Sequence, residues 1–146
     1  MSTGAWIVIG VVLAATAFGL WRRATDGRIR GVDPAAPHAP ADTGDHLTST
    51  DLGAALGERA TLVQFSTAFC QPCRAARRTL AEVADMVQGV EHVEIDAESH
   101  LDLVRRLDVT RTPTIVVLDA QGRVVKRAVG APRKADVIAS LGDVIT

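Results

Sequence analysis

Two cysteines, Cys70 and Cys73, carry the clearest chemistry in this chain of 146 residues, and they are its only cysteines. The apolar run at 62–65 leads into the pair, and after it apolar residues recur at the three- and four-residue spacing of a helix with one buried face. The pair is therefore predicted at a strand-to-helix junction. Unpaired N–H groups and partial positive charge at a helix N-terminus stabilise a thiolate, and we expect Cys70 to be the favoured thiolate.

The residues after Cys70 are typical of a helix start. Pro72 has no backbone N–H to donate, so it suits the first helical turn, where that donor would be unpaired anyway. Arg74, Arg77 and Arg78 add positive charge nearby. Because arginine early in a helix opposes the helix dipole, these side chains indicate a local anion or, for Arg77 and Arg78, an ordinary charged surface.

This part of the sequence resembles the thioredoxin family. Residues 69–73 read FCQPC, which is similar to that family's WCGPC at the same strand-to-helix position. About forty residues later, Thr112 and Pro113 before a strand resemble the family's cis-proline loop, and Gly130 matches the glycine that closes its last strand. The resemblance covers about the last hundred residues. It implies a thioredoxin-like α/β fold, a mixed central sheet flanked by helices.

The chemistry that the resemblance implies is thiol-disulfide exchange. One exposed thiolate attacks a substrate disulfide, and a second thiol nearby releases the mixed disulfide. We assign Cys70 as the nucleophile, Cys73 as the buried resolving thiol, and a Cys70–Cys73 disulfide as the oxidised form. Pro113, cis by the resemblance, would lie beside the pair and stop a metal from using both sulfurs. Thr112 would offer backbone groups to an extended substrate segment, although without the cysteines an ordinary turn would be the better interpretation.

Two departures from the family pattern bear on mechanism. The family's buried aspartate, six residues before the nucleophile, is replaced by Gln64, and its lysine partner aligns with His92. Because glutamine is not a base, Cys73 must lose its proton to water, to the leaving thiolate or to His92, whose alternative role is that of a hydrogen-bonded strand histidine. Phe69 in place of tryptophan and Gln71 in place of glycine alter the rim that a thioredoxin reductase would recognise. An upstream thiol reductase is still the expected electron donor.

The elements that position the cysteines follow from apolar periodicity and turn signals. The pattern predicts a short helix at 52–56, strand 60–66, the active-site helix ending at Gly89, strand 90–95, a helix from a capping box at Ser99 to about 107, strands 114–118 and 124–129 joined by a turn, and a last helix from Pro132. This order predicts α/β layers with parallel pairing across the helices and a closing hairpin.

Residues 5–21 contain no charged side chain, and with residues 2–4 they approach the roughly 20 residues that span a bilayer as a helix. Trp6 and Trp21 suit the two membrane interfaces. A cleavable signal peptide is the alternative, but its N-terminal region is basic, and residues 1–4 carry no basic side chain. The sequence therefore predicts a short tip at 1–4 and an uncleaved transmembrane helix at 5–21.

Four arginines follow the apolar run, at positions 22, 23, 28 and 30. By the positive-inside rule they predict a single-pass cell-membrane anchor, N-out and C-in, with the catalytic domain in the cytoplasm. Alternatively, they only contact anionic headgroups. Residues 22–46 are predicted as a basic juxtamembrane segment and a Pro/Ala/Gly-rich linker, and residues 47–146 as the thioredoxin-like domain.

Several function classes are disfavoured. The net charge is −1 and no basic stripe is interleaved with aromatics, so no nucleic acid partner is expected. A zinc site would need two further ligands, and there is no second cysteine pair. No cofactor is expected, because electrons would travel through the cysteines themselves. The predicted function is a reductase of disulfide-containing protein substrates. The alternatives are a redox-inert binding module on the same fold or, with reversed topology, an extracytoplasmic reductant or oxidant, for example in cytochrome maturation.

Overall fold

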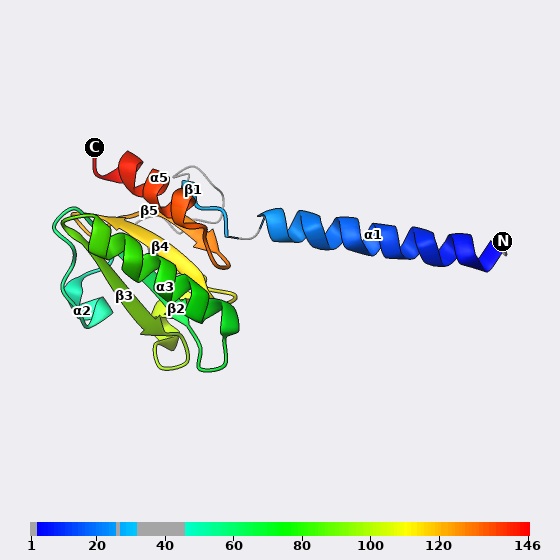
Figure 1. Ribbon diagram of the computed structural model, residues 1–146. Coiled ribbons are helices and arrows are strands. Elements are labelled where there is room, and N and C mark those ends of the chain that lie inside the picture. Colours follow the sequence, from blue (N-terminus) through cyan, green and yellow to red (C-terminus); the bar gives the residue numbers. More distant parts are fainter. Residues whose placement is uncertain (1–2, 26, 32–45) are drawn as a thin grey trace.

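The computed structural model describes residues 3–25, 27–31 and 46–146. In chain order the elements are α1 (Thr3–Thr25), β1 (Arg30–Gly31), α2 (Ser49–Leu52), β2 (Ala60–Ser66), α3 (Gln71–Met86), β3 (Val90–Asp96), α4 (Leu101–Arg106), β4 (Thr114–Asp119), β5 (Val124–Val129) and α5 (Lys134–Val144). Figure 1 shows α1 as a rod outside the α/β domain that the other elements build.

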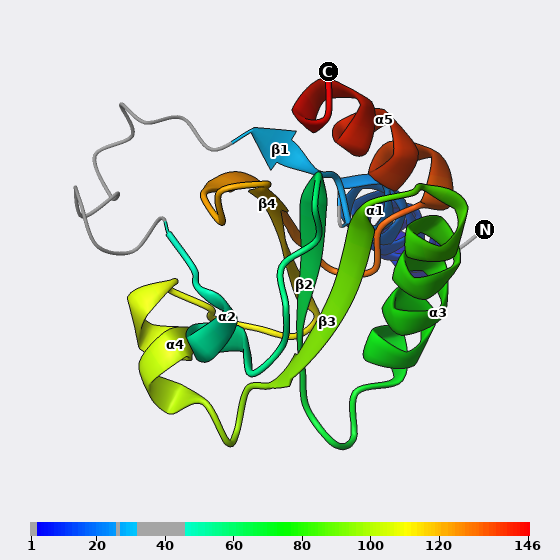
Figure 2. The ribbon, with the colours of Figure 1, turned by 90° about the vertical axis from the view of Figure 1, so that its left-hand side faces the viewer.

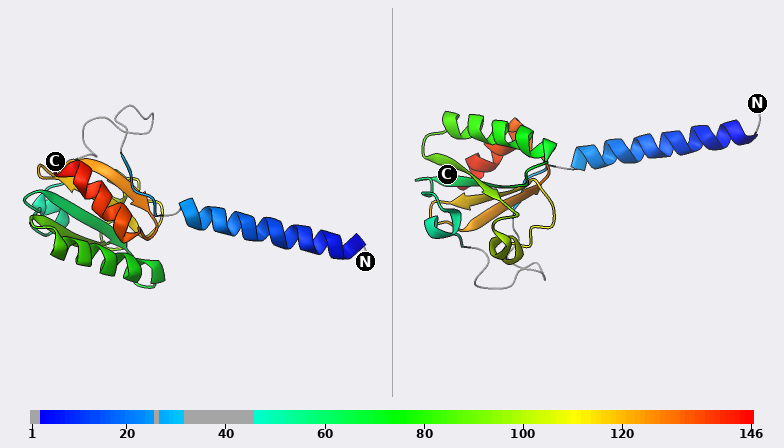
Figure 3. Two further views of the ribbon diagram at one scale, coloured as in Figure 1. Left: turned by 45° about the horizontal axis from the view of Figure 1, so that its top comes forward. Right: turned by 90° about the horizontal axis from the view of Figure 1, so that it is seen from below.

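One mixed sheet organises the domain, with the strand order β1-β5-β4-β2-β3. β2 pairs in parallel with β3 across the α3 crossover, and the other pairs are antiparallel. Helices α3 and α5 cover one face of the sheet, and α2 and α4 cover the other (Figures 2 and 3). The predicted thioredoxin-like architecture, including the closing β4–β5 hairpin, is confirmed.

The core divides into two clusters because side chains alternate between the two faces of each strand. Along β2, Leu62 packs with the α3 and α5 side chains, whereas Val63 and Phe65 pack with those of α2 and α4. All of β2 is buried. Gln64 therefore lies, like Leu62, on the α3 face of a buried strand.

The prediction for the first short helix of the domain is wrong by one turn. The structure has α2 at Ser49–Leu52 rather than at 52–56. The Thr48 side chain accepts a hydrogen bond from the Asp51 N–H, and the Asp51 carboxylate accepts one from the Thr48 N–H, which makes a reciprocal capping box. Gly53, at φ +63°, ends the helix in the left-handed conformation.

Two other helix starts also differ from prediction. Ser99 does not cap α4, because its hydroxyl binds the Asp96 carboxylate and His100 takes the N-cap position without a side-chain capping bond. Helix α5 begins at Lys134, two residues after Pro132. The strands lie as predicted, with β3 and β4 each one residue longer at the C-terminal end.

Part of the predicted linker belongs to the sheet. Arg30 and Gly31 pair with β5, and His46 forms an isolated bridge with Arg123. Two strand residues are too few to show a periodicity, so β1 could not be predicted from the apolar pattern. The rest of the predicted linker, 32–45, lies outside the described residues, as do residues 1–2 of the predicted tip. Helix α1 extends from Thr3 to Thr25, and by length and composition its segment Gly4–Thr25 could cross a membrane.

Candidate functional site

A disulfide joins Cys70 and Cys73 where α3 begins, with the two sulfurs 2.04 Å apart. Cys70 is the N-cap of α3, and its Sγ accepts a hydrogen bond from the Cys73 N–H at 3.2 Å. Pro72 occupies the first turn, where its missing N–H leaves no donor unpaired. Cys73 is only 2% exposed, whereas Cys70 is partly exposed. An incoming thiol or disulfide therefore meets Cys70 first.

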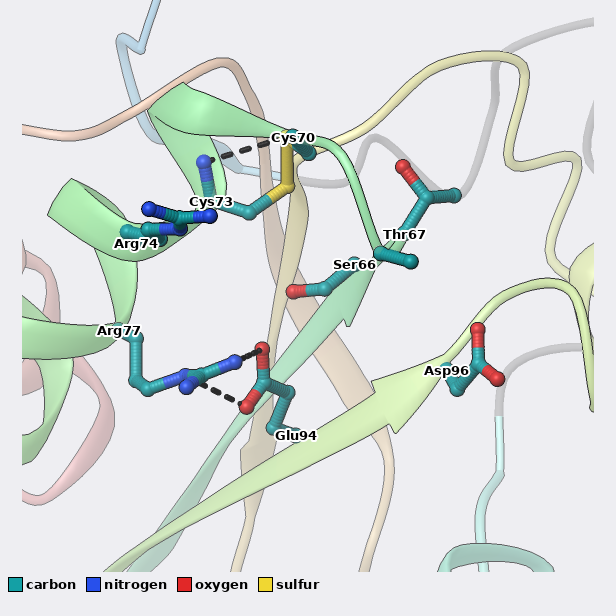
Figure 4. A pocket seen from close by; sticks show the side chains of 9 residues that line it. Ser66, Thr67, Cys70, Cys73, Arg74, Arg77, Glu94 and Asp96 are labelled. Atoms are coloured by element: carbon teal, nitrogen blue, oxygen red, sulfur yellow. Dashed lines mark hydrogen bonds and ion pairs between the residues drawn. A yellow bond between two sulfur atoms is a disulfide. The ribbon is translucent and has the colours of Figure 1, made fainter.

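A pocket of about 510 Å³ opens beside the disulfide (Figure 4). Arg74 and Arg77 reach it from α3, and Glu94 and Asp96 reach it from β3. The remaining lining residues are Ser66, Thr67, Ala68, Cys70 and Cys73. The pocket that the two cysteines line is thus also lined by side chains of both charge signs.

The amide of Gln64 connects the buried Cys73 to β3. Gln64 is fully buried, and its Nε2 donates to the Cys73 carbonyl at 2.9 Å and to the Ser66 hydroxyl at 2.8 Å. A carbonyl only accepts, so the amide must present its nitrogen to Cys73 and its Oε1 to His92. The His92 Nε2, 3.3 Å from that Oε1, therefore carries the proton and donates. Every polar atom of this buried amide has a partner.

Burial lowers the pKa of His92, and the positive charge of Arg77 lowers it further against the opposing effect of Glu94. His92 is consequently neutral near pH 7. For Glu94, burial alone would raise the pKa, but hydrogen bonds from Arg77 and Ser66 and the charge of Arg77 together lower it. The carboxylate is ionised and held in place.

Arg77 binds Glu94 through two contacts, Nη2 to Oε1 at 2.8 Å and Nε to Oε2 at 2.7 Å. The fork-to-fork geometry is the strong form of this pair, yet the arginine side chain is 56% exposed, so solvent screening makes its contribution to stability small. The local anion that Arg77 meets is thus a side chain of β3. Arg74 lines the pocket as well.

The loop before β4 contacts the segment that leads from β2 to Cys70. The Thr112–Pro113 peptide bond is cis, as the resemblance implies. The hydroxyls of Thr112 and Thr67 are 3.2 Å apart, which ties this loop to the segment between β2 and Cys70. Pro113 is buried, and its carbonyl accepts a hydrogen bond from the Gly130 N–H at 2.8 Å. The three marks of the family resemblance therefore meet in one place.

Phe69 and Gln71 flank the disulfide on the outside. Phe69 is 98% exposed, and Gln71 is exposed too. These two rim positions present an apolar ring and an amide to any partner that approaches Cys70.

Sequence reasoning missed Ser66 and Glu94. A signal was present for Glu94: in β3, His92, Glu94 and Asp96 alternate with apolar residues. The register that pairs Gln64 with Glu94 comes from the structure alone. Within the described ranges 3–25, 27–31 and 46–146, no group of three or more His, Cys, Asp and Glu side chains could hold a metal ion. The arrangement is suited to exchange between thiols and disulfides.

Comparison with known proteins agrees with this chemistry. Residues 46–143 match the family model for thioredoxin. Thioredoxin of Mycoplasma genitalium is 31% identical over 77 residues, which cover 53% of this chain and 74% of that protein. Thioredoxin of Mycobacterium tuberculosis is 31% identical over 85 residues, or 58% and 72%. Thioredoxin H2 of Arabidopsis thaliana is 31% identical over 72 residues, and the match spans only 53% of its length.

Solved structures share the fold. Chloroplastic thioredoxin z superposes with a TM-score of 0.58 at 24% identity, covering 73% of this chain and 97% of that one. Thioredoxin of Fasciola hepatica gives a TM-score of 0.53 at 24% identity, covering 60% and 83%. At this identity the two structures support the fold alone.

The first prediction concerns the buried amide. Replacing Gln64 by Leu removes its hydrogen bonds and leaves the Cys73 carbonyl and the Ser66 hydroxyl buried without this partner, so the free energy of unfolding should fall by about 2 kcal/mol. The free energy of unfolding is measured by urea unfolding, followed by circular dichroism. The protein used is an oxidised fragment that begins at Gly27 and so keeps β1. Gln71→Leu, at an exposed glutamine, is the matched control and should change stability by less than about 0.5 kcal/mol. Equal losses would contradict this account of Gln64.

The second prediction is a pH dependence. A histidine in the unfolded chain titrates near pH 6.5, and burial lowers the pKa of His92 in the folded state. Below about pH 6.5 His92 binds a proton in the unfolded state but not yet in the folded state. The free energy of unfolding therefore falls as the pH drops toward the lowered pKa. His92→Gln should remove this component. The stability difference between wild type and variant should therefore change between about pH 7.5 and 5.5 in favour of the variant. A difference that is constant across this range would refute the expectation.

Proposed function

The chain belongs to the thioredoxin family, and from this premise we propose that it is a membrane-anchored thiol-disulfide oxidoreductase that reduces disulfides in protein substrates. One observation carries the proposal. At the N-terminus of α3 an accessible sulfur, Cys70, is bonded to a buried one, Cys73, beside the cis-Pro113 loop. A purely structural disulfide has no need of this asymmetry between its sulfurs.

In the proposed reaction the Cys70 thiolate attacks one sulfur of the substrate disulfide, and the other substrate sulfur leaves as a thiolate. The Cys73 thiolate then attacks the Cys70 Sγ, which breaks the mixed disulfide and closes the Cys70–Cys73 bond. Two electrons pass to the substrate, whose two thiolates take up the protons that the cysteines lose. An upstream thiol reductase must return the pair to the dithiol form.

The proton of Cys73 needs an acceptor, and we propose the leaving thiolate or water. Gln64 is not a base, and the Nε2 of His92 donates to the Gln64 Oε1, so that nitrogen has no lone pair to offer. In this proposal Gln64 and His92 are positioning residues. They hold the Cys73 backbone, and with it the resolving sulfur, against β2 and β3.

The substrate would lie across the exposed rim. Phe69 offers an apolar contact, Gln71 a polar one, and Thr112 offers backbone groups at the start of β4. Arg74 adds positive charge in the adjoining pocket, where it would favour the thiolate of Cys70.

Anchoring rests on α1, which is apolar enough to span a bilayer. We propose the N-out, C-in orientation with the domain in the cytoplasm. The arginines that end α1, Arg22 and Arg23, support it through the positive-inside rule.

The third prediction tests the roles of the two cysteines. Cys73→Ser leaves a nucleophile without a resolving thiol, so it should accumulate a mixed disulfide with a protein such as insulin. Cys70→Ser should accumulate at least about tenfold less, because the remaining sulfur is buried. Non-reducing gels of the full chain in detergent measure both. Equal trapping would refute the assignment, and no insulin reduction by the wild type together with no trapping would favour the redox-inert binding module.

The fourth prediction tests the orientation. A membrane-impermeant maleimide added to intact cells should leave the reduced Cys70 unlabelled and label it only after lysis. Labelling in intact cells would place the domain outside and favour the extracytoplasmic alternative. The reduction potential of the pair would then decide its direction, with roughly −250 mV or below for a reductant and above about −180 mV for an oxidant.

A further inference from the structure

The anchor is fastened to the sheet almost directly. The Gly27 N–H donates to the Val129 carbonyl at 2.7 Å, and β1 continues this pairing along β5. Only Asp26 separates Gly27 from Thr25, the last residue of α1. Consecutive Cα atoms are 3.8 Å apart, so the end of α1 lies within about 8 Å of Gly27 whatever direction the helix takes.

This docking is a built feature of the domain. Gly27 has φ +81°, and a Cβ there would come within 2.2 Å of the Ala131 carbonyl oxygen, so the close approach requires glycine. Two residues on, Ile29 packs against the core cluster that lies under α3 and α5. Residues 27–31 are therefore held by hydrogen bonds, backbone fit and apolar packing together.

The active site and the docked segment lie at the same end of the strands. The register aligns Phe65, Thr114 and Val129 in one row across β2, β4 and β5. Phe65 is near the end of β2, from which the chain continues to Cys70, and Thr114 directly follows Pro113. Val129 accepts the hydrogen bond from Gly27, where the anchor joins the domain. Figure 3 shows α1 leaving the domain at the end where α3 begins.

Strand spacing sets the distance between anchor and disulfide. Neighbouring strands are about 4.8 Å apart, so the three steps from β2 to β1 span about 14 Å. Allowing for the loop from Ser66 to Cys70, the disulfide lies roughly 15 to 20 Å from the point where the anchor joins the domain. Trp21 and the arginines after it suit the membrane interface, which brings that joining point to the headgroups.

We propose that the active site works at the membrane surface and that its substrates are membrane proteins whose reducible disulfide lies within about 20 Å of the bilayer. The inference rests on the proposed function, namely an anchored oxidoreductase, and adds the class of substrate. A domain on a long free tether would reach soluble proteins as readily as membrane proteins. Here the docked residues 27–31 keep the exposed Phe69 and the partly exposed Cys70 at the end of the domain that carries the anchor.

The test uses the full chain in vesicles of phosphatidylcholine and phosphatidylglycerol. Two probes carry the same disulfide peptide on a transmembrane helix, one directly after the helix and one behind a flexible spacer of about forty residues. The same peptide in solution is the third substrate. We expect the membrane-proximal disulfide to be reduced at least about tenfold faster than the distant one, because docking raises its effective concentration.

Two insertions separate docking from chain length. About twenty Gly and Ser residues placed between Asp26 and Gly27 free the domain from the anchor, whereas the same insert between Ala35 and Ala36 lengthens the segment after β1 and leaves the docking intact. Only the first should abolish the preference for the proximal probe, and both should keep the rate on the soluble peptide. Gly27→Val, which obstructs the docking without lengthening the chain, should reduce the preference as well.

The outcomes are distinguishable. Equal rates on the two membrane probes, or equal effects of the two insertions, would overturn the inference and leave the proposed function standing. A wild-type chain that reduces no soluble peptide would refute the oxidoreductase, and one that fails to float with the vesicles would refute the anchor. The inference falls with either of these.

Discussion

The register of β2 between its two neighbours is the constraint on which the site depends. β2 is buried along its whole length, parallel to β3 on one side and antiparallel to β4 on the other. Its last residue, Ser66, determines where Cys70 begins the helix, and the pairing of Phe65 with Thr114 brings Pro113 to the cysteines. A slip of one residue would turn Gln64 to the opposite face and remove its bonds to Cys73 and His92.

The side chain that contacts the Cys73 backbone, Gln64, is neutral, and the charged side chains of the site lie elsewhere. A buried carboxylate at position 64 would be costly without a counter-charge, whereas Gln64 needs only hydrogen bonds, and it has them. The charges lie instead on the wall of the pocket, where Glu94 is neutralised by Arg77 and hydrogen-bonded by Ser66. The buried Cys73 is thus held through hydrogen bonds to its backbone, whereas the charged side chains lie on the wall of the pocket.

The sequence could predict what depends on local pattern. The cysteine pair at a strand-to-helix junction and the strands of the hairpin follow from periodicity and turn signals, and they lie as predicted. The start of α2 was missed because a reciprocal contact between Thr48 and Asp51 outweighed the later apolar residues. The ion pair of Arg77 with Glu94 spans 17 positions and exists only because β3 lies beside β2 in this register, which no local pattern shows.

The Pro-rich segment shows how composition can mislead about reach. Read along the chain, residues 22–46 suggest a tether that lets the domain explore its surroundings. In the fold, the chain pairs with β5 at Arg30 and Gly31, before residue 32, and again contacts the sheet at His46. The length of chain between these two points therefore does not set the distance from α1 to the sheet. For a domain anchored through α1, as proposed, a single residue would separate the anchor from the docked segment. Two strand residues and one glycine, rather than the length of the segment, would then decide which disulfides the cysteines meet.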